Sequence, residues 1–191
     1  MPERVNEDRL RAFMRAAGAA ARREGVCYLT GGATAVLLGW RGATLDIDVR
    51  LEPEQDELMR RLPAIKHDLR INVETASPAE FIPLPDGWQE RSPFAGREGK
   101  LTFRHFDLYA QALAKIERGH EKDRLDVAAM LERGLVDAEL LREMFDEIEP
   151  RLYERPELDA ASFRRKLEEA LTAAATPELD PSEDISPDID F

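Results

Sequence analysis

Hydrophobic and polar positions form their clearest pattern in the first third of the chain. The apolar run Val26–Leu29 predicts a short strand, and the apolar run Ala33–Leu38 predicts a buried helix that follows a Gly-Gly turn. Residues alternate in character along Leu45–Leu51, which predicts a second strand. This alternation places Asp46 and Asp48 on one face of the strand, opposite a face made of Leu45, Ile47 and Val49.

The flanking segments predict the rest of an α/β unit. Apolar residues recur at helical spacing in Asn6–Glu24, where Asn6 is placed to cap the helix. Pro53 opens a polar helix that runs to about Leu62, where Pro63 interrupts it. The remaining predicted strands are Leu69–Thr75 and a hairpin of Trp88–Phe94 with Lys100–Arg104.

The second half of the chain has a helical pattern. Gly119, Gly134 and Pro150 mark the breaks between helices, and Asp137 and Asp159 are predicted caps. The predicted helices are Asp107–Arg118, Asp123–Arg133, Ala138–Glu149 and Ala160–Ala175. We therefore predict an α/β (α+β) fold in which a small mixed sheet is flanked by helices and followed by a helical bundle.

This pattern divides the chain into three parts. Residues 1–105 form the predicted α/β core, residues 106–175 the helical extension, and residues 176–191 an acidic tail predicted to be disordered. The net charge of −12 argues against a broad DNA-binding surface, although the tail carries six of the acidic residues and no basic ones. A local basic groove elsewhere remains open.

Composition also narrows the setting and the kinds of site. No apolar run is long enough to span a membrane and the N-terminus lacks a signal-like apolar core, so the expected location is cytoplasmic. Cys27 is the only cysteine, which excludes an internal disulfide framework and a cysteine-based zinc site. The three histidines are scattered, so surface or capping roles are expected for them.

The aspartate pair and the Gly-Gly turn are the candidate chemistry. Side chains two apart on a strand lie on one face at roughly 7 Å, so Asp46 and Asp48 are placed to share Mg²⁺. The turn Gly31-Gly32 would let backbone N–H groups approach phosphate oxygens closely. Each feature alone is commonly a solvated face or a tight turn, but in this order they indicate a metal-nucleotide site.

Strand, Gly-Gly, helix and Asp-x-Asp in this order resemble the signature of the nucleotidyltransferase superfamily with the polymerase-beta-like fold. The resemblance continues from Phe106 through Lys115 to the segment Lys122-Asp123-Arg124-Leu125-Asp126. These residues are similar to a bacterial nucleotidyltransferase-like family of unknown function that is related to AbiEii-type toxins. The similarity covers about Val26 to Val136.

The resemblance implies specific roles. Asp46 and Asp48 would bind Mg²⁺ (or Mn²⁺), Gly31-Gly32 would hold the triphosphate of a nucleoside triphosphate, and Lys115 with Asp123 or Asp126 would complete the cleft. Helical spacing also places Lys115 on an inward stripe, where a buried ammonium needs a partner. Alternatively, Lys115 extends past the stripe to solvent, and Asp123 is a helix N-cap.

Two parts of the superfamily pattern are missing. Active members usually add a third carboxylate, for which Glu74 is the first candidate and Glu80 the second. A serine often accompanies the second glycine, and Ala33 stands here instead, so Thr30 or Thr34 would supply the hydroxyl. Trp40, next to Arg41 in the loop before Asp46, is placed either for packing or to line a nucleotide pocket.

The sequence therefore predicts transfer of a nucleoside monophosphate from a nucleoside triphosphate to a hydroxyl of protein, RNA or a small molecule. The resemblance further suggests a toxin of a toxin–antitoxin pair, with a cognate antitoxin as partner. One alternative is a catalytically inactive protein-interaction module or antitoxin partner, and another is a metal-dependent nuclease. A third carboxylate near Asp46 and Asp48 would favour the active enzyme.

Overall fold

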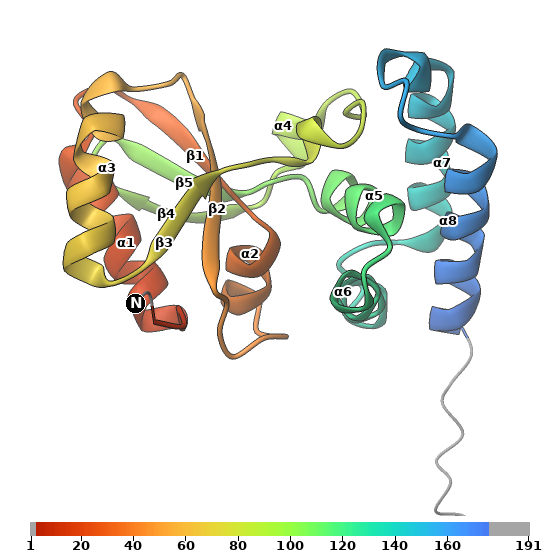
Figure 1. The fold of residues 1–191 in the computed structure, drawn as a ribbon, viewed down its shortest axis with the longest axis horizontal. Coiled ribbons are helices and arrows are strands. Elements are labelled where there is room, and N and C mark those ends of the chain that lie inside the picture. Colours follow the sequence, from red (N-terminus) through yellow and green to blue (C-terminus); the bar gives the residue numbers. More distant parts are fainter. Residues whose placement is uncertain (1–2, 176–191) are drawn as a thin grey trace, which may run out of the picture.

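A five-stranded mixed sheet in the order β3-β2-β1-β5-β4 forms the first half of the protein, and helices form the second. The computed structural model describes residues 3–175 (Figure 1). The first half comprises α1 (Glu7–Ala20), β1 (Gly25–Thr30), α2 (Gly31–Leu37), β2 (Asp46–Glu52), α3 (Asp56–Leu69), β3 (Asn72–Thr75), η1 (Pro78–Glu80), α4 (Trp88–Arg91), β4 (Phe94–Glu98) and β5 (Leu101–His105). The predicted α/β class is confirmed.

The two central strands determine what each face of the sheet carries. β1 pairs antiparallel with β2 and parallel with β5, while β2 pairs parallel with β3. One face packs against α1 and α3, burying Ile47 and Val49 of β2 in the main core. On the other face Trp88 stacks on Phe106 at 4.4 Å, with Tyr28 beside both rings. The alternation along β2 thus separates a buried face from a polar one.

Three predictions in this half are wrong at their edges. Leu45 lies outside β2 and is 62% exposed. Pro63 does not interrupt α3, because it lies on the exposed side while Leu58 and Ile65 hold the helix against the core on either side of it. The helix instead continues to Leu69, where a strand was expected to begin.

Two other boundaries also differ. The first helix ends at Ala20 rather than Glu24. Trp88 begins the helical turn α4 rather than a strand, because its ring is buried against Phe106, and the hairpin starts only at Phe94. Cys27 is a buried core thiol, and burial raises its pKa to about 12.

The helices of the second half pack around their own core. They are α5 (Leu108–Arg118), α6 (Glu121–Glu132), α7 (Ala138–Ile148), the 3-10 helix η2 (Glu149–Glu154) and α8 (Ala160–Ala175). Asp137 and Asp159 cap α7 and α8 as predicted, accepting backbone N–H bonds of 2.9 and 2.7 Å. None of the helices within residues 3–175 is long and apolar enough to cross a membrane. The acidic tail lies outside the described residues.

Candidate active site

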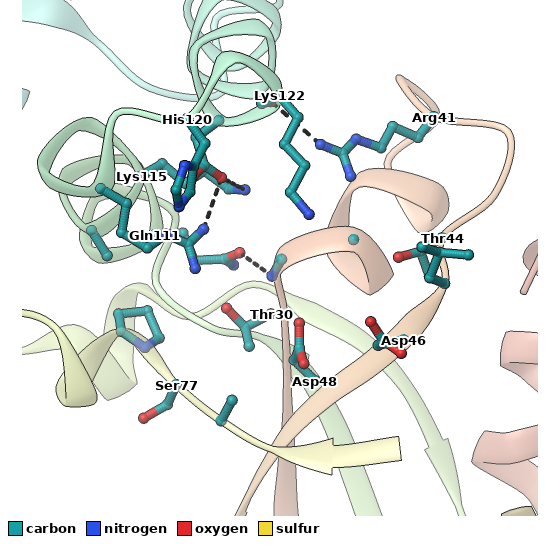
Figure 2. A pocket seen from close by; sticks show the side chains of 18 of the residues that line it. Thr30, Arg41, Thr44, Asp46, Asp48, Ser77, Gln111, Lys115, His120 and Lys122 are labelled. Carbon is teal, nitrogen blue, oxygen red and sulfur yellow. Dashed lines mark hydrogen bonds and ion pairs between the residues drawn. The ribbon is translucent and has the colours of Figure 1, made fainter. Parts of the chain in front are cut away.

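A cavity of about 450 Å³ separates the polar face of the sheet from the helical half (Figure 2). One wall comes from the sheet half, where the polar lining residues are Arg4, Thr30, Arg41, Thr44, Asp46, Asp48 and Ser77. The other comes from α5 and α6 and presents Gln111, Lys115, Arg118, His120, Lys122 and Asp123. The cavity therefore joins the two segments that carry the sequence resemblance.

The turn between β1 and α2 requires both of its glycines. Gly31 has a φ of +57°, a conformation that favours glycine. A Cβ atom on Gly32 would lie 2.0 Å from the Oγ1 of Thr44, so no side chain fits there without displacing that threonine. The N–H of Gly31 donates to the Oε1 of Gln111 at 2.9 Å, which ties the turn to α5.

Asp46 and Asp48 project from the polar face of β2 beside this turn (Figure 2). Asp48 is in register with Thr30 on β1 and with Glu74 on β3, while Asp46 is in register with Asn72. Burial raises the pKa of Asp48 to about 6, and the negative charges of Asp46 and Glu74 add to the effect. A group of carboxylates that repel one another is the environment in which a bound cation is stabilising.

Glu74 stands in the adjacent strand but does not line the cavity. The amide of Asn72 donates to both Asp46 and Glu74, at 2.9 and 2.8 Å, and so links the two carboxylates. Glu80 accepts from the backbone of Ser77 in a capping box and is engaged there. Within residues 3–175 no group of three or more His, Cys, Asp or Glu side chains is arranged to hold a metal ion.

The donor chemistry of the pair nevertheless fits Mg²⁺. This ion commonly takes only one or two carboxylates from the protein and completes its shell with water and substrate phosphates. Asp46 and Asp48 are half-buried and open to the cavity, and neither forms an ion pair with a cation of the described chain. The two aspartates can therefore provide the protein part of such a site.

The helical wall contains a buried network of charges. The ammonium of Lys115 lies 2.6 Å from Asp126 and 3.2 Å from Asp123, and its side chain is only 7% exposed. Asp123 also pairs with Arg118 at 2.8 Å, whereas its second carboxylate oxygen is buried and has no hydrogen-bond partner in the described part of the chain. Lys115 thus does not extend to solvent, and Asp123 is not the N-cap, because α6 begins at Glu121 after His120.

Asp126 also connects the two halves of the protein. It accepts from the indole of Trp40 at 3.0 Å and pairs with Arg41 at 2.8 Å. Of these two loop residues only Arg41 lines the cavity, and Asp126 lies behind the wall rather than in it. No local pattern predicts these contacts, because the partners are 85 and 86 residues apart in the chain.

Two of the expected roles change with the geometry. Thr34 lies outside the cavity, where its buried hydroxyl donates to the carbonyl of Leu29 at 3.0 Å, so Thr30 is the threonine beside the turn. His105 is buried next to Thr34 rather than exposed or capping, and burial lowers its pKa to about 4.

Several cavity residues had no predicted role in the site, and Gln111 and Lys122 are the most informative of them. Gln111 lies one helical turn before Lys115 on the same inward stripe, which was a usable signal. Lys122 points into the cavity from the first turn of α6, as Figure 2 shows. Its ammonium forms no hydrogen bond or ion pair with any residue in the described range 3–175, unlike that of Lys115. The available cation of this wall is therefore Lys122.

Comparison of the sequence with known proteins and protein families gives one match. A family model described as nucleotidyltransferase of unknown function (DUF6036) matches residues 10–174. No curated protein and no solved structure gives a match. Because the matched segment includes the sheet, the cavity and the helical half, the protein belongs to this family of nucleotidyltransferases of unknown function.

Proposed function

We propose that the protein is a nucleotidyltransferase that uses Mg²⁺ or Mn²⁺ to transfer a nucleoside monophosphate from a nucleoside triphosphate to a hydroxyl group. The observation that best supports this is the pair Asp46 and Asp48, which faces the cavity beside the Gly31-Gly32 turn and has no cationic partner among residues 3–175. The raised pKa of Asp48 indicates that the charged form of this carboxylate is destabilised as long as no cation is near.

The nucleotide would lie between the two walls. Its triphosphate fits between the Gly31-Gly32 turn and the ammonium of Lys122, where a backbone turn without side chains faces an unpaired cation. Arg41, whose guanidinium donates to the backbone carbonyl of Lys122, would add a second positive charge. Its ion pair with Asp126 would hold that guanidinium in place. Lys115 would act indirectly, since its ammonium is taken up by Asp123 and Asp126.

The reaction is an in-line displacement at the α-phosphorus. The oxygen of the acceptor hydroxyl forms a bond to this phosphorus, the bond to the oxygen bridging to the β-phosphate breaks, and pyrophosphate leaves with the electron pair. A divalent cation held by Asp46 and Asp48 would stabilise the charge on the attacking and leaving oxygens. The proton of the hydroxyl would pass through solvent to Glu74, which is exposed outside the cavity lining but in register with Asp48 on the next strand.

The biological setting proposed from the sequence resemblance is a toxin of a toxin–antitoxin pair in the cytoplasm, with protein, RNA or a small molecule as acceptor. A growth assay examines this part separately. Expression of the wild-type chain should arrest growth, and Asp48→Asn should abolish the arrest at equal protein level.

One observation favours a second candidate, a catalytically inactive interaction module. No third metal-binding side chain joins Asp46 and Asp48 in the described part of the chain, so the metal site depends on substrate oxygens. An inactive module would keep the fold and the cavity but would not release pyrophosphate.

The two candidates are separated by nucleotide binding and turnover. The purified chain is mixed with Mg²⁺ or Mn²⁺ and each of ATP, GTP, CTP and UTP, and thermal unfolding and pyrophosphate release are followed. A ligand at one hundred times its dissociation constant stabilises by about 2.7 kcal/mol, which is a rise of roughly 5–10 °C for a chain of this size.

The paired variant Asp46→Asn with Asp48→Asn should lose both signals, whereas Asp68→Asn, which changes one exposed carboxylate, should keep them. Stabilisation without pyrophosphate release in any acceptor mixture would favour the inactive module. No shift with any nucleotide would count against the transferase. Cleavage of RNA in the absence of nucleotide would point to a nuclease instead.

A further inference from the structure

A second cavity, of about 770 Å³, lies next to the first along strand β2. β2 contributes Asp46 and Asp48 to the first cavity and Arg50 to the second, and η1 contributes Pro78 to the first and Ala79 to the second. Neither the sequence resemblance nor the family match assigns a role to this second space. The second cavity therefore extends the site along β2 beyond Asp48.

Arg50 ties the two cavities together. It lies two residues after Asp48 on the same face of β2, at a distance of roughly 7 Å along the strand. Its guanidinium lies over the ring of Trp88 at 5.1 Å and pairs with Glu52 at 2.7 Å. Stacking on a buried ring holds the charge in place, and the edge of the guanidinium remains available to a ligand.

Two further arginines approach from the helical half. The guanidinium of Arg151 donates to the carbonyl of Leu84, and that of Arg155 donates to the carbonyl of Ala79. Each guanidinium has five N–H donors, so one such bond leaves most of them free. The backbone contacts fix both side chains against the loop after η1, where they line the second cavity together with Arg50.

The acidic residues of this cavity compensate these charges only weakly. Asp86 is 88% exposed and lies 3.6 Å from Arg151, longer than a charge-assisted hydrogen bond. Glu154 lines the cavity from an exposed position. Outside the lining, Glu52 pairs with Arg50 at 2.7 Å and Glu147 lies 3.9 Å from Arg151. The lining itself contains three guanidinium groups and two exposed carboxylates. Planar guanidinium groups match the oxygens of phosphate better than any other side chain does.

We propose that the second cavity binds a phosphate group of the acceptor, so that the acceptor hydroxyl comes to lie at Asp48. The inference that this cavity binds an anion depends only on the residues that line it. Its role as the acceptor site rests on the proposed transfer reaction. The acceptor is thereby narrowed to a molecule that carries a phosphate within about 7 Å of its reacting hydroxyl. A phosphorylated small molecule and the end of an RNA strand share this chemistry.

Binding is tested with the full chain in the absence of nucleoside triphosphate. Inorganic phosphate, a nucleoside 5′-monophosphate, a single-stranded RNA trinucleotide and an unphosphorylated nucleoside are titrated by calorimetry and by tryptophan fluorescence. Fluorescence is measured in a Trp40→Phe background, so that the signal comes from Trp88, whose ring lies under Arg50. Phosphate-bearing probes should bind and the nucleoside should not. Preference for the trinucleotide identifies an RNA end as the source, and preference for the monophosphate identifies a small molecule.

Arg50→Gln should weaken the binding of the phosphate-bearing probes by about tenfold, because it removes a charge-assisted hydrogen bond. The variant should still fold, because Glu52, the ion-pair partner of Arg50, has a side chain that is 32% exposed and remains in contact with solvent. Arg60→Gln is the matched control, since Arg60 is 74% exposed on α3 and pairs only with Glu57.

Failure of this inference is distinct from failure of the proposed function. Equal affinities for Arg50→Gln and Arg60→Gln, or no binding of any phosphate-bearing probe, would overturn the second site even if pyrophosphate is released with other acceptors. Loss of phosphate binding in Arg50→Gln alone, together with no pyrophosphate release under any condition, would support the anion site and overturn the transferase.

Discussion

Two pairs of aspartates lie on opposite sides of the first cavity, and their surroundings differ. Asp46 and Asp48 stand on a strand, half-buried, with no cation of the described chain in ion-pair contact. Asp123 and Asp126 stand on a helix, with side chains 0% and 1% exposed, and Lys115 lies between them. The first pair is left open to a ligand, whereas the second is neutralised by the protein itself.

The difference separates residues that hold the site from residues that can act in it. A carboxylate already paired with buried cations has its charge compensated and adds rigidity, because breaking the pair leaves an uncompensated charge. A carboxylate crowded by other carboxylates is destabilised until a cation or a proton arrives. The resemblance to nucleotidyltransferases implicates both pairs, and only the structural surroundings tell their roles apart.

Removing Asp126 should have the largest effect on folding. Asp126→Ala leaves the buried Lys115 and the loop residue Arg41 without their shared partner, so the free energy of unfolding should fall by about 3–5 kcal/mol. Urea unfolding measures the change. Asp68→Ala is the control, because Asp68 is exposed and paired only with its neighbour His67, and it should change stability by less than about 0.5 kcal/mol.

A fall of less than about 1 kcal/mol in the free energy of unfolding of Asp126→Ala would contradict this contrast between the two aspartate pairs, since Asp126 would then behave as a surface carboxylate does. Asp126→Asn sharpens the measurement, because the amide oxygen can still accept from the indole of Trp40. It should destabilise less than the alanine variant.

The sequence predicted those parts of the fold that short-range chemistry decides. Alternation along β2 placed Asp46 and Asp48 on one face, and the caps at Asp137 and Asp159 set the starts of α7 and α8. The predictions of a helix break at Pro63 and a strand at Trp88 were wrong, because packing against distant elements decides the conformation of these residues. Local rules cannot report a ring that is buried against another ring many residues away.

The same limit applies to the candidate site. Strand periodicity was enough to find one aspartate pair, and helical periodicity was enough to turn Lys115 inward. The partners of Lys115 and Asp126 depend on how the loop after α2 meets α6, which no local pattern encodes. For the same reason Thr34 was a reasonable candidate from its place in the sequence, although the fold buries it below the turn.

Gly32→Ala should have the next largest effect on stability. It tests how tightly the Gly31-Gly32 turn packs against Thr44 in the sheet wall of the cavity. A Cβ atom there would lie 2.6 Å from the Cβ of Thr44, so the turn or the threonine must move, at a cost of about 2 kcal/mol. Helix propensity alone predicts a gain, because alanine is favoured over glycine within a helix. Urea unfolding decides the sign, and Gly42→Ala, where a Cβ meets open space, is the control.

If Gly32→Ala is as stable as the wild type, Thr44 is not packed tightly against the turn. The sheet wall would then be adaptable, and the contrast with the rigid network of the helical wall would be greater than the static contacts suggest.

Asp48→Asn should have the smallest effect on folding and the opposite sign to Asp126→Ala. Burial, with the charges of Asp46 and Glu74, raises the pKa of Asp48 to about 6 in the folded chain, against an ordinary value of 3.8. Between these values the folded state binds more protons than the unfolded state, so this group makes stability fall as pH rises from about 4 to about 6. Above pH 6 the destabilisation is complete.

An asparagine cannot ionise, so Asp48→Asn should be more stable than the wild type by about 1–2 kcal/mol at pH 7.5, allowing for solvent screening. Near pH 4 the wild-type carboxyl is already protonated, and the difference should vanish. Urea unfolding of both proteins across this range, without divalent cations, measures it. A variant less stable than the wild type at pH 7.5 would mean that the protein supplies Asp48 with its own stabilising partner, and the two aspartate pairs would then be alike.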